Sequence, residues 1–178
     1  VYDNDAIYIG AMLYDDSPDK ILKEITQRDD FGTSDVFGVF INGYNDGQQD
    51  FQFFVNAADG QSDCITTDTN GEDYSWDAVW KSKAIITNKG WVVEMRIPYA
   101  ALRFSSEKKQ TWSLNFFREI RRDRHKYTWN RIDSKLGTFT QQAGILEGIE
   151  NIKTPTRLFL FFFSSFYVNA NAHQKTYG

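Results

Sequence analysis

The stretch that decides the fold is Asp35–Asn56, which reads DVFGVFINGYNDGQQDFQFFVN. Its first part, Val36–Ile41, is β-branched and aromatic, a composition typical of strands packed on a pleated surface. Asn45–Gly47 follows with residue types that tolerate the positive φ angles of tight turns. Phe51–Val55 then resumes the strand composition. Two aromatic strands across an Asn-Asp-Gly turn predict a β-hairpin, which we expect at the centre of a β-sandwich.

Strand patterns recur along the rest of the chain, whereas helical periodicity is confined to short turns that begin at Pro18 and Pro98. The further predicted strands are Ala6–Tyr14, Trp80–Thr87, Trp91–Ile97, Thr111–Ile120 and a last strand-like piece within Phe139–Ile149. Ala57–Asp77 is acidic and poor in aliphatic residues, so we expect a long loop there. The sequence therefore predicts an all-β protein, an antiparallel and jelly-roll-like β-sandwich.

The chain of 178 residues is predicted to form one sandwich domain over residues 1–153 and a connector over residues 154–178. The connector contains the aromatic stretch Leu158–Val168, LFLFFFSSFYV. It has the length of a tilted transmembrane β-strand, about 9–11 residues, and would equally suit an extra sandwich strand. Because an unpaired aromatic strand would aggregate, we expect it to pair with the sandwich, a barrel or another chain.

The first residue is Val1 rather than methionine, and a strand pattern follows almost at once. We therefore expect the sequence to be a fragment of a longer protein, with an upstream segment such as an export signal.

Composition excludes one class of function and favours another. The net charge of -4 argues against an electrostatic nucleic-acid binder. Aromatic residues make up 16% of the chain, and such side chains supply both core volume and recognition surface. Trp80, Trp91 and Trp112 lie inside strand patterns, so we expect them in the core.

Catalysis has little support in the sequence. Glu94 and Glu119 are carboxylates without a partner at a recognisable spacing, and His125 and His173 lie far apart. Cys64 is the single cysteine and has no neighbouring base. The chain carries no nucleophile motif, no zinc-binding HExxH and no phosphate-binding glycine loop. We therefore expect a protein that is not an enzyme.

Two tryptophans and a basic stretch are the candidates for ligand binding. Trp76 and Trp129 lie beside polar loops, which predicts exposed rings for stacking, although they could instead close the edge of the sandwich. Arg118, Arg121 and Arg122 could donate bidentate hydrogen bonds to sugar hydroxyls, uronates or phosphates. The alternative for the arginines is a solvated, charged strand or loop.

Asn42, Asp46 and Asp50 could hold a structural calcium, because Ca²⁺ prefers oxygen ligands. The spacing from Asn42 to Gly47 matches part of a calcium loop, but Phe53 stands at the twelfth position, where such a loop has glutamate. Turn chemistry alone would also explain these residues, so both interpretations stay open. The sequence indicates no other cofactor.

The order of these motifs resembles that of family 9 carbohydrate-binding-module-like domains. The closer resemblance is to the version that precedes an outer-membrane-barrel region in exported bacterial proteins of unknown function. It covers Ala6 to Ile152 and rests on residues 35–47, 53–56, 76–80, 90–104, 112–116 and 118–129, in that order. Thr154–Leu158 resembles the connection to the first barrel strand.

The resemblance implies an antiparallel β-sandwich, and founding members of the family bind sugar-chain ends between two tryptophans. It implies a non-catalytic domain, exported to the periplasm or outer-membrane surface of a Gram-negative bacterium. Its partner would be a glycan or protein of the cell envelope, with membrane contact through a C-terminal barrel. The alternative is a structural or interaction domain on that barrel, with no sugar ligand.

Three positions depart from the sugar-binding members. Gly38 stands where those members carry an acidic residue, and Lys126 stands where they carry an asparagine. Phe31 is the nearest aromatic residue upstream of Gly38, where those members also carry an aromatic residue.

Overall fold

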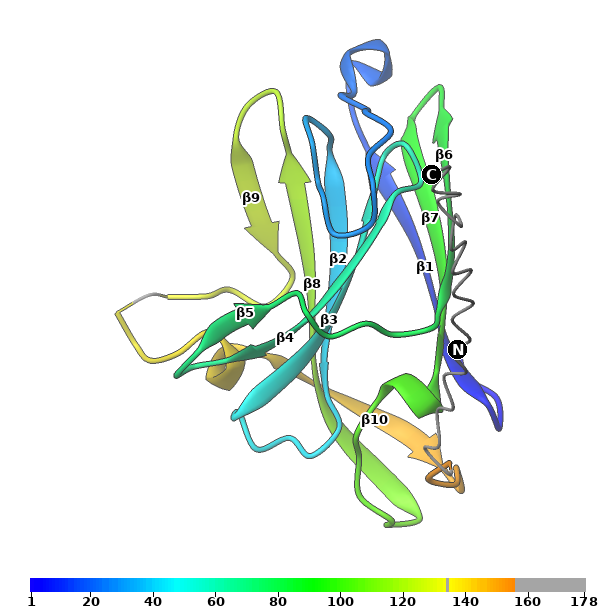
Figure 1. The fold of residues 1–178 in the computed structure, drawn as a ribbon, viewed down its shortest axis with the longest axis vertical. Helices are drawn as coiled ribbons and strands as arrows, with labels where there is room; N and C mark the ends of the chain where they lie inside the picture. Colours follow the sequence, from blue (N-terminus) through cyan, green and yellow to red (C-terminus); the bar gives the residue numbers. More distant parts are fainter. Residues whose placement is uncertain (134, 156–178) are drawn as a thin grey trace, which may run out of the picture.

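The computed structural model describes residues 1–133 and 135–155, which are almost entirely β-structure (Figure 1). The strands are β1 (Ala6–Tyr14), β2 (Val36–Asn42), β3 (Gln49–Asn56), β4 (Gln61–Thr67), β5 (Gly71–Asp73), β6 (Lys81–Thr87), β7 (Gly90–Pro98), β8 (Lys109–Ile120), β9 (His125–Thr128) and β10 (Gly144–Glu150). Short 3₁₀ turns are η1 (Pro18–Lys20), η2 (Tyr99–Ala101) and η3 (Thr140–Gln142). None of these turns has the length or apolarity that a helix needs to cross a membrane. The aromatic stretch Leu158–Val168 lies outside the described residues.

The strands form two antiparallel sheets, which confirms the predicted sandwich (Figure 1). The larger sheet has the order β10-β8-β2-β3-β4-β5, with β9 pairing beside β10 on the same edge of β8. The smaller sheet has the order β1-β7-β6 and covers one face of the larger sheet. We call this covered face the inner face and the opposite one the outer face.

The predicted hairpin is confirmed and is central to the larger sheet. Val36 pairs with Asn56 and Ile41 pairs with Phe51, while the other edge of β2 pairs with β8. In the connecting turn, Asn45 and Gly47 have positive φ angles of 52° and 65°. Every residue of β2 is buried, so the strand is covered on both faces.

Side chains of the inner face build the main core with the smaller sheet. Phe37, Val39 and Ile41 of β2 pack in the same apolar cluster as Trp91 and Val93 of β7. The expected core tryptophans are confirmed. The exposed fractions of Trp80, Trp91 and Trp112 are 6%, 0% and 0%.

The outer face is also apolar at its centre. Side chains from three loops lie over this centre and bury it. Its buried apolar residues are Val36, Phe40, Phe54 and Cys64. Phe31, Tyr74, Phe117 and Phe139 pack around this group. The larger sheet therefore carries a second aromatic cluster, here called the outer cluster, which provides the base of the candidate site.

The prediction of a long loop over Ala57–Asp77 is wrong, because this stretch contains β4 and β5. Its acidic residues are compatible with strands because residues far away in the sequence provide hydrogen-bond and ion-pair partners for their carboxylates. Asp63 of β4 is fully buried and contacts Arg28 and Trp80, which lie 35 and 17 residues away. The predicted strand within Phe139–Ile149 begins only at Gly144, because η3 precedes it.

Candidate binding pocket

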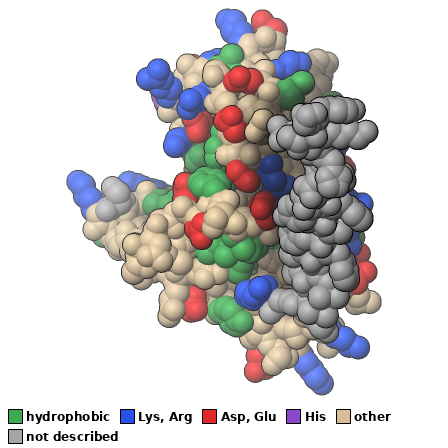
Figure 2. All heavy atoms as spheres, in the orientation of Figure 1, with side chains coloured by type: hydrophobic (Ala, Val, Ile, Leu, Met, Phe, Trp, Pro, Cys, Tyr) green, Lys and Arg blue, Asp and Glu red, His purple; other side chains and the backbone are tan. Residues whose placement is uncertain are grey.

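A pocket of about 440 Å³ lies on the outer face of the larger sheet, beside the outer cluster. Its floor is apolar and comes from three strands: Val36 of β2, Phe54 of β3 and Phe117 of β8. Phe31 and Tyr74, on two separate loops, complete the aromatic lining. Figure 2 shows a face on which hydrophobic side chains lie between acidic and basic groups. A pocket of this size suits a small ligand.

Gly38 explains why the floor is aromatic. A Cβ atom at this position would lie 2.7 Å from Cδ1 of Phe54, so only glycine leaves room for the ring. Phe54 then packs edge-on against Phe31, with ring centroids 5.2 Å apart, and against Phe117 at 6.1 Å. The place of the acidic residue expected from sugar-binding members is therefore filled by aromatic rings.

Polar groups surround this floor. On the side formed by β8 and β9, Arg121 donates to Glu119 at 3.0 Å, and Nζ of Lys126 lies 3.9 Å from the second oxygen of Glu119. On the opposite side the hydroxyl of Tyr74 donates to Glu72 at 3.0 Å. Donors and acceptors thus alternate around an apolar base, an arrangement that orients a ligand with both polar and apolar parts.

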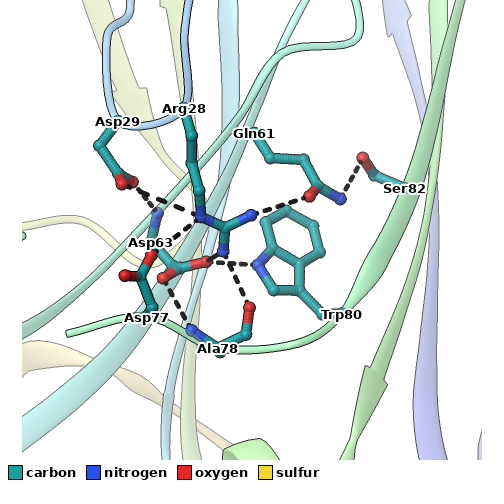
Figure 3. A network of polar contacts seen from close by, with 8 residues as sticks. All are labelled: Arg28, Asp29, Gln61, Asp63, Asp77, Ala78, Trp80 and Ser82. Atoms are coloured by element: carbon teal, nitrogen blue, oxygen red, sulfur yellow. Dashed lines mark hydrogen bonds and ion pairs between the residues drawn. The ribbon is translucent and has the colours of Figure 1, made fainter. Parts of the chain in front are cut away.

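Arg28 fixes the loop that forms one wall of the pocket (Figure 3). Its guanidinium group contacts the carboxylate of Asp63 and donates to the carbonyl oxygen of Ala78 at 2.9 Å. It also donates to Asp77 at 3.1 Å and to the side-chain oxygen of Gln61 at 3.2 Å. The planar fork of arginine donors suits such a multiple contact.

Asp63 is the buried centre of this network. Besides Arg28, it accepts hydrogen bonds from Nε1 of Trp80 at 2.5 Å and from the backbone N–H of Ala78 at 3.1 Å. Burial nevertheless raises the pKa of Asp63, because the loss of hydration outweighs these favourable partners. The ion pair with Arg28 therefore offsets part of the cost of burying this carboxylate.

The network continues directly into the pocket. Asp29, next to Arg28, has a φ angle of 64° and accepts a hydrogen bond from the backbone N–H of Asp63 at 3.0 Å. Asp29 and Phe31 both line the pocket. The contacts of Arg28 and Asp29 with β4 therefore hold Phe31 in place over the sheet.

The three predicted arginines lie on different sides of the larger sheet. Arg121 lines the pocket. Arg118 and Arg122 instead contact Asp15, just after β1, at 3.8 Å and 2.9 Å. Burial opposes ionisation of Asp15, but hydrogen bonds from Arg122 and the backbone of Ser17 outweigh it and lower the pKa of Asp15. These two arginines therefore tie the two sheets together.

The two predicted tryptophans lie on the inner face and pack against different strands. Trp76 is half-buried, with its ring 5.2 Å from that of Phe51 on β3. Trp129 is 61% exposed, packs 5.9 Å from Phe116 on β8 and covers Gly144. Strand β2 lies between β3 and β8, so the two rings pack against strands that are not direct neighbours.

The predicted calcium ligands form part of a turn. Asn42 donates to Asp46 at 2.8 Å, and the backbone N–H of Gln48 donates to the same oxygen at 3.1 Å. Asp50 lies on β3, where burial and the charges of Asp68 and Asp46 raise its pKa to about 7. Across residues 1–133 and 135–155, no three His, Cys, Asp or Glu side chains are grouped to hold a metal ion. A calcium site here stays a prediction.

Sequence reasoning from residue types missed most of the pocket, including Phe54, Glu72, Tyr74, Phe117 and Glu119. One available signal was the alternation of β8, which places Phe117 and Glu119 opposite Arg118. The alignment with sugar-binding members did point here, since Phe31 and Lys126 line the pocket and Gly38 adjoins its floor.

Cys64 lies beneath this region on β4 and is fully buried. Burial raises the pKa of its thiol to about 12, so the thiol stays protonated at neutral pH.

No family model and no curated protein matches the sequence. Among solved structures, the fold is similar to a family 9 carbohydrate-binding module from Caldicellulosiruptor kristjanssonii, solved with cellotriose and with glucose. Both comparisons give a TM-score of 0.57 over 87% of this chain and 73% and 74% of the module, with 15% and 17% identity.

A protein from Bacteroides uniformis ATCC 8492, described as carbohydrate-binding, gives a TM-score of 0.53 at 16% identity. That match covers 65% of this chain and 61% of the other. Together, the comparisons show a fold like that of family 9 carbohydrate-binding modules.

Proposed function

We propose that this chain is a non-catalytic carbohydrate-binding domain that holds a glycan in the pocket on the outer face. The observation that carries the proposal is the composition of the pocket, an aromatic floor ringed by carboxylates and cationic groups. Sugars are held in this way, by contacts between C–H groups and rings and by hydrogen bonds to hydroxyls. The likeness in fold to modules solved with cellotriose and glucose supports it.

Each polar residue has a role in this proposal. Glu72 and Glu119 accept hydrogen bonds from sugar hydroxyls, while Arg121 and Lys126 donate to sugar oxygens. Phe31 and Tyr74 contact the apolar faces of the ring. Trp129 lies on the other face of the larger sheet, so any contact it makes with a glycan would be separate from the pocket.

The cellular setting is proposed from the sequence resemblance alone. We propose that the parent protein is exported to the Gram-negative cell envelope and continues into an outer-membrane barrel. The glycan ligand would then belong to the periplasm or to the cell surface.

Calorimetric titration with a panel of neutral, acidic and amino-sugar oligosaccharides tests the function. We expect binding that weakens about tenfold or more in Glu119→Gln and in Lys126→Ala, because each removes a charge-assisted hydrogen bond worth about 1.5–3 kcal/mol. Lys89→Ala, in the turn between β6 and β7, is the matched control and should bind like the native chain. A panel without any binder, or pocket variants that bind normally, would refute the proposal.

A further inference from the structure

We infer that the pocket selects sugars that carry an acetamido group. The inference rests on the proposed glycan-binding function and specifies its ligand class. It starts from the floor, where Val36, Phe54 and Phe117 present only carbon atoms. The close approach of Phe54 to Gly38 keeps that floor free of any polar side chain on β2 at this point.

An unsubstituted sugar can place its C–H groups on this floor, but not its hydroxyl groups. A hydroxyl group directed at Val36 and Phe54 would lose its water without gaining a hydrogen bond there, which is unfavourable. A methyl group in the same place would instead bury apolar surface, which is favourable. The floor therefore favours a sugar with an apolar substituent over one with hydroxyls alone.

The rim identifies which substituent fits. An acetamido group joins its methyl to one acceptor, the carbonyl oxygen, and one donor, the N–H. The wall formed by β8 and β9 offers groups that match both. Arg121 and Lys126 are cationic donors for the carbonyl oxygen, and the carboxylate of Glu119 between them is an acceptor for the N–H. The methyl can then point toward Phe117, which adjoins this wall, with Nζ of Lys126 lying 6.0 Å from the centroid of its ring.

A free amino sugar fits less well than its acetylated form. Both oxygens of Glu119 already face cations, at 3.0 Å to Arg121 and 3.9 Å to Lys126. Glu72 across the pocket is engaged by the hydroxyl of Tyr74. An ammonium group would therefore meet partly neutralised carboxylates above an apolar floor, where desolvation of its charge is unfavourable.

Matched sugar series test the inference on the native chain. For gluco, galacto and manno configurations, calorimetry compares methyl glycosides that differ only at carbon 2, which bears a hydroxyl, a free amine or an acetamido group. We expect the acetamido form of at least one series to bind tenfold or more tightly than its two counterparts.

Two results would overturn the inference, and they are distinguishable. If unsubstituted sugars bind as tightly as acetamido sugars in every series, the inference fails while the proposed glycan binding stands. If no sugar in these series or in the broader oligosaccharide panel binds, both fail together.

Val36→Thr provides a structural test, because it places a hydroxyl in the floor with little change in shape. We expect the acetamido preference to fall below about threefold, because the new hydroxyl removes the apolar contact for the methyl group. Ile145→Thr, on the exposed surface of β10, is the matched control and should keep the full preference. A Val36→Thr variant that folds, as judged by circular dichroism, and keeps the tenfold preference would contradict the role of the floor.

Discussion

Asp50 shows at the scale of one residue how the fold changes chemistry. The side chain points to the outer face of β3, is only 2% exposed, and lies near the charges of Asp68 and Asp46. Its pKa is therefore raised from 3.8 to about 7. Because the folded state binds the proton more tightly, stability from this group is present below pH 3.8 and is lost as the pH rises toward 7.

Asp50→Asn should therefore stabilise the protein at pH 8 by up to a few kcal/mol, since each pKa unit corresponds to about 1.4 kcal/mol. Little gain is expected at pH 4, where Asp50 is already neutral. Urea unfolding of both chains at the two pH values, in EDTA, measures the difference. Asp19→Asn, on the exposed turn η1, is the control. An equal effect of Asp50→Asn at both pH values would contradict the explanation.

The same variant bears on the calcium prediction. If Asn42, Asp46 and Asp50 hold Ca²⁺, added calcium should raise the Tm of the native chain and leave that of Asp50→Asn unchanged.

At the scale of elements, the loop before β2 depends on one side chain for its position. Arg28 links this loop to β4 and to the segment before β6 through Asp63, Asp77 and Ala78 (Figure 3). Arg28→Met keeps the aliphatic stem but leaves Asp63 buried without its ion-pair partner. Because the Arg28 side chain is about a third exposed, we expect a loss of roughly 1–3 kcal/mol in stability.

Chemical unfolding of Arg28→Met measures that loss, and sugar titration measures the effect on the pocket. The double variant Arg28→Met/Asp63→Asn should recover part of the stability, because it removes the unpaired charge. Lys89→Met, in the exposed turn between β6 and β7, is the control for replacing a cationic side chain by methionine. Native stability in Arg28→Met would show that the ion pair does not support the loop.

At the scale of the whole molecule, the apolar core of the described residues ends before the predicted connector begins. Ile149 and Ile152 are the last residues of the main apolar cluster among the described residues. A chain that ends at Lys153 should therefore unfold in a single cooperative transition, with a Tm within a few degrees of the full chain. Differential scanning calorimetry checks this.

A shorter chain that ends at Ala143 provides the contrast. It removes β10, which pairs with β8 from Gly144 to Glu150 and carries Ile149 into the core. This chain should lose its cooperative transition. If the chain ending at Lys153 also fails to fold, the predicted boundary between residues 153 and 154 is wrong.

The sequence by itself determined most of the strands, the central hairpin and the buried tryptophans, but it did not predict β4, β5 or β9. The hairpin could be predicted because Val36–Ile41, Asn45–Gly47 and Phe51–Val55 are neighbours in the chain. Alternation and turn chemistry are local properties, so they can be read from consecutive residues. The resemblance added the likeness in fold, and it marked Phe31, Gly38 and Lys126 before any geometry was known.

Only the tertiary structure decided where a ligand could bind. Phe54 and Phe117 meet because β2 pairs with both β3 and β8. Phe31 and Tyr74 reach them from two separate loops. The same pairing places Arg121 at the pocket and turns Arg118 toward Asp15. Which distant residues meet depends on long-range strand pairing and on burial. Neither is contained in the local pattern around any one residue.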